Sequence, residues 1–134
     1  MARALKPFDL EGAWRITRRV IGTNTRFEGT ARLTPDGDVL AYYEDGILQH
    51  EGKNSPAFRR YIYQQTDNRL IVMHPDGAAF LDLMFKNGEA RARHVCGADT
   101  YDALFRFYAG GHWMAAYDIS GPHKNYRIVT RLMR

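Results

Sequence analysis

Cysteine is almost absent from this chain of 134 residues, and long apolar runs are missing altogether. Because Cys96 is the single cysteine, no intramolecular disulfide can form, which is typical of proteins from a reducing compartment. The stretch MARALKPFDL at the start has no apolar run long enough for a signal peptide or a membrane-spanning helix. We therefore expect a cytoplasmic protein with no membrane partner.

A helical period and a concentrated block of charge are missing as well. Lys and Arg number 19 against 15 Asp and Glu, for a net charge of +4, but no block of five or more basic residues occurs. Arginines are densest early in the chain, at positions 15, 18, 19, 26 and 32. We interpret them as solvated outer faces of strands, with a polyanion-binding surface as the alternative. We do not expect a nucleic-acid partner.

What the sequence does have is regular punctuation by turn residues. Asp-Gly, Asn-Gly and related groups supply the positive φ that tight hairpins need. They occur at 22–24, 35–37, 44–46, 66–68, 75–77, 87–88, 110–111 and 121–125. The runs between them are rich in aromatic and β-branched residues and predict strands at 12–21, 25–34, 38–44, 46–51, 58–65, 69–74, 79–86, 89–96, 100–109, 112–119 and 125–133.

Side chains alternate along these runs. In RFEGTARL, Phe27 and Leu33 share one face, whereas Arg26 and Arg32 share the other. One wetted and one buried face are typical of an antiparallel sheet. A long meander of hairpins avoids exposed edges by closing on itself. The sequence therefore predicts an all-β protein: a single antiparallel up-and-down β-barrel of about ten strands, with residues 1–134 as one domain.

The stretch LEGAWRI carries a resemblance. Gly12-x-Trp14 at the start of a first strand resembles the first signature of lipocalin-like (calycin) proteins. The resemblance implies that the tryptophan plugs the closed end of the barrel and that an arginine of the last strand, Arg127 or Arg131, packs across it. The order Asp-Thr-Tyr at 99–101 only faintly echoes the second signature.

Nearly the whole chain also resembles one family of uncharacterised lipocalin-like domains. The stretches that carry this resemblance are FDLEGAWRITRRV, FEGTARLTPDG, YYEDGIL, FRRYIY, PDGAAFLDL, HVCGADTY and GPHKNYRIVTRLMR. The family implies the barrel fold but brings no function with it. The lack of disulfides separates the chain from typical secreted lipocalins, which argues against an extracellular carrier.

The stretch HVCGADTY holds the first candidate site. His94 shares its strand face with Ala90 and Ala92, and such small residues leave space in front of the histidine. We predict that His94 faces the barrel interior and that the short turn after it places Tyr101 alongside. The two would bind a ligand or act as an acid/base pair. The alternative is a histidine that merely fills the barrel, hydrogen-bonded to Tyr101 or Asp99.

Two further stretches predict positive charge in the pocket. In GPHKNY, Lys124 and Tyr126 alternate into the last strand and would meet an anionic group together. In FRRYIY, Arg60 or Arg59 would point inward beside Tyr61 as a clamp for a carboxylate or phosphate. The alternatives are an exposed hairpin lysine and core tyrosines.

Metal ligands are not evident from spacing. The five histidines show no His-x-His or His-Glu-x-x-His pattern, so we predict no metal site and no cofactor. A haem or metal held through His94 is an alternative. Cys96 and Asp99 are interpreted as structural, since a lone cysteine on a buried face is usually a small hydrophobe.

The function that follows is an intracellular barrel whose interior binds one small, partly apolar anionic molecule. The ligand-binding residues would be Arg60, Tyr61, His94, Tyr101, Lys124 and Tyr126. One alternative is a small enzyme of cyclase, isomerase or decarboxylase type with His94 and Tyr101 as acid and base. Another is a basic interaction module. Fold alone does not choose among them, and both a monomer and a homodimer remain open.

Overall fold

The computed structural model describes residues 10–134, which form ten strands and, over this range, no helix. The strands are β1 (Gly12–Ile21), β2 (Thr25–Asp36), β3 (Val39–His50), β4 (Lys53–Thr66), β5 (Arg69–Met73), β6 (Ala79–Met84), β7 (Glu89–Cys96), β8 (Asp99–Phe107), β9 (Trp113–Ser120) and β10 (Asn125–Met133). No helix among the described residues is long and apolar enough to span a membrane.

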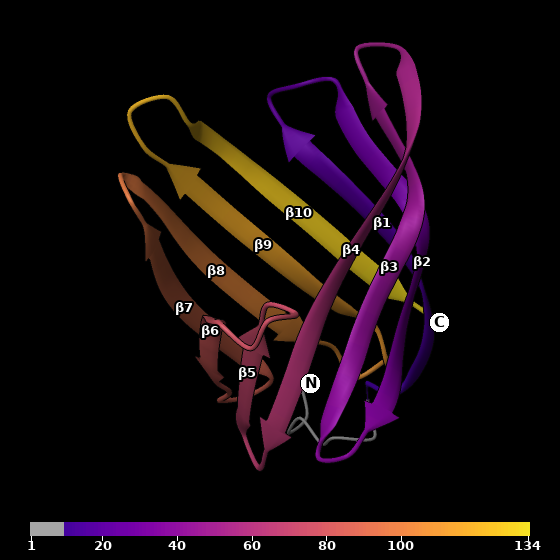
Figure 1. The fold of residues 1–134 in the computed structure, drawn as a ribbon, viewed down its shortest axis with the longest axis vertical. Helices are drawn as coiled ribbons and strands as arrows, with labels where there is room; N and C mark the ends of the chain where they lie inside the picture. The colour runs from indigo at the N-terminus through magenta and orange to yellow at the C-terminus, as the bar shows by residue number, and fades with distance from the viewer. Residues whose placement is uncertain (1–9) are drawn as a thin grey trace.

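All ten strands belong to one antiparallel sheet in the order β6-β5-β4-β3-β2-β1-β10-β9-β8-β7. First and last strands pair, so the sheet curls into a nearly closed barrel (Figure 1). The seam lies between β6 and β7. Among the described residues, β6 and β7 share no ladder of hydrogen bonds, and an isolated bridge joins Lys86 to Glu89 in the turn between them. The predicted all-β, up-and-down barrel of about ten strands is confirmed.

One predicted turn is wrong. The group Glu44-Asp45-Gly46 does not break the chain, and the two segments predicted at 38–44 and 46–51 form the single strand β3. Gly46 pairs with Gly29 of β2, and a Cβ on either glycine would collide with the backbone of the other strand. The glycine is therefore needed for close approach of two strands and not for a positive φ. The reversal comes later, at Glu51 and Gly52, both of which have positive φ.

Large apolar side chains fill the end of the barrel where β1 and β9 begin. The interior faces of the strands contribute Trp14, Phe105, Phe107 and Trp113 to one buried cluster. The ring of Phe107 stacks on that of Trp113 at 5.2 Å, and the two tryptophans meet edge to face at 6.1 Å. This end of the barrel is closed by packing, which leaves the opposite end for a pocket.

The predicted arginine across Trp14 exists, but it is Arg134. Its guanidinium carbon lies 4.0 Å from the centre of the Trp14 ring, and its Nη2 donates to the Glu11 carbonyl at 3.1 Å. Gly12, with φ of 114°, leaves room for this arginine. Arg127 instead pairs with Asp118 at 3.3 Å, and Arg131 is exposed. The prediction of Arg127 or Arg131 was wrong because the residue that reaches the tryptophan follows the last strand.

The barrel is open on one side of its upper part. Strand β5 pairs with β4 only over residues 62–66, so residues 53–61 of β4 have no partner on that edge in the described range. Figure 1 shows β5 and β6 beside the lower part of β4, while its upper part stands clear of them. Short β5 and β6 therefore leave a side entrance above the packed core.

Candidate ligand-binding pocket

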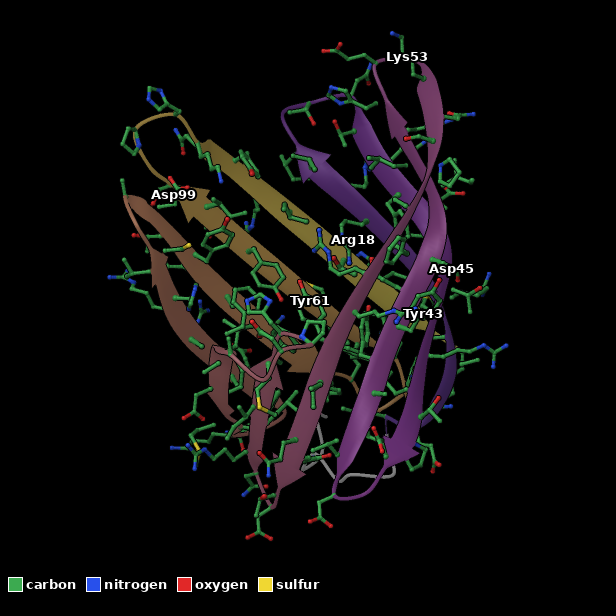
Figure 2. All side chains as sticks on the ribbon, in the orientation of Figure 1. Arg18, Tyr43, Asp45, Lys53, Tyr61 and Asp99 are labelled. Atoms are coloured by element: carbon green, nitrogen blue, oxygen red, sulfur yellow. The ribbon has the colours of Figure 1, made fainter. Side chains whose placement is uncertain are left out.

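A cavity of about 470 Å³ lies at this side entrance. It is lined by Arg18, Arg59, Arg60, Tyr61, His74, Phe80, His94, Cys96, Tyr101, Tyr117, Ile119, Tyr126 and Ile128. Its size is within the range of small-molecule sites. Figure 2 shows Arg18 and Tyr61 in the middle of the barrel, whereas Lys53 and Asp99 lie at its rim. The described lining contains arginine, histidine and tyrosine but no Asp or Glu.

His94 lies on the pocket face of β7, as the alternation predicted. Arg91 and Arg93 on the same strand are exposed on the outer side. His94 is the direct neighbour of Tyr101 on β8, with 6.2 Å between ring centres. No hydrogen bond joins His94 to Tyr101 or to Asp99 in the described structure, so the alternative of a hydrogen-bonded filler residue finds no support.

Arg18 lines the pocket and is held by Glu44, which lies outside the lining. Its Nη1 and Nη2 donate to the two carboxylate oxygens of Glu44 at 2.6 and 2.8 Å, and its Nε donates to the Thr130 hydroxyl at 2.8 Å. The Tyr42 hydroxyl donates to the same carboxylate at 2.6 Å. Thr130 lies on β10 and Arg18 on the adjacent β1. Tyr42 and Glu44 lie on β3, which β2 separates from β1. Glu44 is therefore fully engaged by its neighbours.

The ion pair sets the protonation of both partners. Burial alone would raise the pKa of Glu44, but the hydrogen bonds and charge of Arg18 outweigh it and lower the pKa. Burial would likewise lower the pKa of Arg18, but the bonds to Glu44 raise it instead. Glu44 is thus ionised at neutral pH, and Arg18 is neutralised by a carboxylate outside the pocket lining.

Arg59, and not Arg60, carries its charge on the interior face of β4. Arg59 alternates in phase with Tyr61 and donates to the Tyr61 hydroxyl at 3.4 Å. The Arg60 guanidinium lies over the outer ring of Tyr43 at 5.0 Å and that of Phe58 at 5.9 Å. Arg60 touches the rim of the cavity but does not point into it. The arginine that points inward, as predicted for Arg60 or Arg59, is therefore Arg59. Neighbouring residues of a strand point to opposite faces, so Tyr61 and Arg60 cannot both face inward.

Lys124 does not line the cavity. Its Nζ is 3.1 Å from a carboxylate oxygen of Asp99 and 6.0 Å from the centre of the Tyr101 ring. The bond to Asp99 raises the pKa of Lys124. The prediction of Lys124 as a charge inside the pocket is corrected: it ties the β9–β10 turn to the start of β8 at the rim. Tyr126, two residues on, does line the pocket as predicted.

Sequence reasoning missed Tyr117 and Phe80. Tyr117 shares the interior face of β9 with Trp113 and Ile119, so the alternation contained the signal. Burial raises the pKa of Tyr117 well above its ordinary value and keeps its hydroxyl neutral. Phe80 lies in phase with Asp82 and Met84, which point outward, and its inward position depends on a bulge opposite Val72 and Met73 that no sequence signal revealed.

No metal centre is built into the described residues, where no group of three or more His, Cys, Asp or Glu side chains converges. His74 and His94 lie on either side of Phe80, with ring centres 5.1 Å from it. Cys96 borders the cavity at the exposed end of β7 and is not buried, contrary to the interpretation as a core hydrophobe. A haem or metal held through His94 stays the alternative to the prediction of no cofactor.

The other early arginines lie outside the barrel. Arg15, Arg19, Arg26 and Arg32 are exposed on the outer faces of β1 and β2, and Arg19 lies directly opposite Arg26. Arg18 is the exception in this group, since it points inward. The interpretation of the arginines as solvated strand faces therefore describes their position, apart from Arg18.

Both the sequence and the structure of this chain are similar to those of known proteins. Residues 10–134 match the model of a family described as a family of unknown function (DUF6314). No curated protein matches the sequence. The structure is similar to that of the S-type phycobiliprotein lyase CPES from Guillardia theta, with a TM-score of 0.66 at 10% sequence identity. The match covers 95% of this chain and 89% of the lyase. It confirms the lipocalin-like fold predicted from Gly12-x-Trp14.

Proposed function

The chain belongs to the DUF6314 family of unknown function, and on that premise we propose that its barrel binds a small, partly apolar anionic molecule in the pocket between β4, β7 and β9. The observation that carries the proposal is the position of Arg59. Arg59 is solvent-exposed, shares the interior face of β4 with Tyr61 and donates to its hydroxyl, within a lining whose described residues include no carboxylate.

Charge selects an anion in such a site. Glu44 is the cross-strand neighbour of Arg59, and both of its carboxylate oxygens already accept hydrogen bonds from Arg18 and Tyr42. A guanidinium presents a fork of N–H donors that matches a carboxylate or phosphate. Arg59 is therefore available to pair with an anionic group of the ligand.

The remainder of the lining favours an apolar body on that ligand. Tyr61, Tyr101, Tyr117 and Phe80 present ring surfaces, and Ile119 and Ile128 add aliphatic ones. Pockets of this kind gain affinity from buried apolar area and orientation from a few polar groups. The similarity to a phycobiliprotein lyase supports the barrel fold on which the proposal depends, but it does not identify the ligand.

Binding is favoured over catalysis. The described lining contains no carboxylate that could orient His94 or Tyr101. A general acid or base needs such an orienting partner or a positioned substrate. We place the binder in the cytoplasm because the single cysteine suits a reducing compartment.

The experiment compares 2-naphthoate with its neutral analogue 2-naphthalenemethanol by calorimetry. We expect the carboxylate to bind and Arg59→Gln to weaken it about tenfold or more, as expected for loss of a charge-assisted hydrogen bond. Arg19→Gln is the matched control and should leave the affinity unchanged, because Arg19 is exposed on the outer face of β1 and is not among the lining residues. Equal affinity of acid and alcohol, or binding that survives Arg59→Gln and His94→Ala unchanged, would refute the proposal.

A further inference from the structure

Phe80 lines the pocket, and its ring contacts those of five other lining residues: Tyr61, His74, His94, Tyr101 and Tyr117. Its ring plane is within 9° of that of Tyr61 at 6.0 Å and within 14° of that of Tyr117 at 6.2 Å. Tyr61 on β4 and Tyr117 on β9 thus both hold their rings nearly parallel to that of Phe80. We call the place that Phe80 occupies beside these two rings the slot.

Phe80 lies outside the regular pairing of its strand. Val72 pairs with Leu81 and Met73 pairs with Ala79, so Phe80 is the extra residue of a bulge and has no cross-strand partner. Bulges re-aim single side chains and occur beside functional sites. Strand β6 is also the last strand of the sheet, hydrogen-bonded along its length only to β5 in the described range.

Across the seam between β6 and β7, Phe80 makes ring contacts where the two strands have no backbone pairing. It meets His94 of β7 edge to face at 5.1 Å and Tyr101 of β8 at 6.2 Å. No described ladder of hydrogen bonds joins β6 to β7 at this height. Rotation or withdrawal of one side chain on a bulged edge strand would thus open the seam without breaking the sheet.

We propose that Phe80 is the gate of the pocket and that the ligand is a planar aromatic anion whose ring takes the place of Phe80 beside Tyr61 and Tyr117. This inference rests on the proposed function and specifies its ligand class. Parallel ring faces favour a flat ring over a flexible chain. Arg59 donates to the Tyr61 hydroxyl, so the positive charge lies at the edge of the slot, where an acid group on the ring would meet it.

The test uses two anions of the same charge and similar size, 2-naphthoate and decahydro-2-naphthoate, which differ in planarity. We expect wild-type protein to bind the planar acid about tenfold more tightly, and its ring protons to shift upfield in the bound state. Tyr61→Leu should reduce this preference to near unity. If both acids bind equally in an Arg59-dependent way, the pocket is an anion site but the slot is wrong; if neither binds, the proposed function itself fails.

Gating is tested by association kinetics. Phe80→Ala should raise the association rate constant for 2-naphthoate by about tenfold, because the ligand can then enter without prior displacement of the Phe80 ring. Phe80→Leu keeps more apolar volume and should give an intermediate rate in a folded protein. Met84→Ala changes an exposed side chain of the same strand and should not alter the rate. An unchanged rate in both folded Phe80 variants would overturn the gate.

Discussion

The guanidinium of Arg18 and the carboxylate of Glu44 form a two-pronged ion pair inside the barrel wall, at 2.6 and 2.8 Å. Side-chain exposure is 15% for Arg18 and 2% for Glu44, so the pair is largely withdrawn from water. Charges in such a place stabilise a fold only while both are present. The pair joins β1 to β3 across β2 beneath the candidate pocket.

Removal of one partner should be costly. We expect Arg18→Met and Glu44→Leu each to lower the free energy of unfolding by about 3–5 kcal/mol, since each leaves an uncompensated buried charge. The double variant should lose less than the sum of the two, with a coupling energy of about 0.5–3 kcal/mol. Denaturant unfolding of the four proteins measures the cycle, and strictly additive losses would contradict it.

Acid should weaken this ion pair. The pKa of Glu44 is lower in the folded protein than its ordinary value of 4.5, so the unfolded chain binds the proton first. The stabilisation is complete above about pH 4.5 and is lost as the pH falls through the folded value. The free energy by which wild type exceeds Glu44→Gln should therefore shrink as the pH falls below about 4.5.

The control for this pH effect is an exposed pair. Asp82 meets Arg69 at 2.6 Å, and both side chains are about half exposed. Solvent screens such a pair, so Asp82→Asn should change stability little at any pH. A Glu44→Gln difference that stayed constant with pH would show that the carboxylate is not held in its charged form.

The closed end of the barrel depends on Trp14 and Arg134. Trp14→Ala should cost about 3–5 kcal/mol, because the indole is 3% exposed and packs on Trp113. Arg134→Ala should cost about 1 kcal/mol through loss of the cation–π contact. Arg131→Ala, which removes an exposed arginine nearby, should be close to neutral in thermal unfolding. Equal effects of the two arginine variants would speak against the cap.

Gly46 should tolerate no side chain. A Cβ there would collide with the backbone of Glu28 and Gly29, so Gly46→Ala must push β2 and β3 apart. We expect a loss of about 1–3 kcal/mol, as for other overpacked sites. Gln49→Ala, at an exposed position of the same strand, is the control. Hydrogen exchange along β2 and β3 locates the effect, and wild-type stability of Gly46→Ala would contradict the close approach.

Sequence alone determined the barrel and much of one pocket wall. Alternation with period two decides which residues share a face, and turn residues decide where strands end. This is why His94, Tyr101 and Tyr126 were assigned to the interior, whereas the place of Trp14 at the closed end was implied only by the resemblance of Gly12-x-Trp14 to the lipocalin-like signature. It also contained the choice between Arg59 and Arg60, because Tyr61 can share a face only with Arg59.

Only the tertiary structure decided which groups meet. The partnership of Arg18 with Glu44 depends on barrel curvature that brings side chains of non-adjacent strands together. Lys124 pairs with Asp99 because the rim turns lie side by side after closure. Phe80 turns inward through a bulge that breaks the period on which the sequence argument depends. Local alternation fixes the face of each residue, whereas register, curvature and the place of the seam arise from packing across the whole sheet.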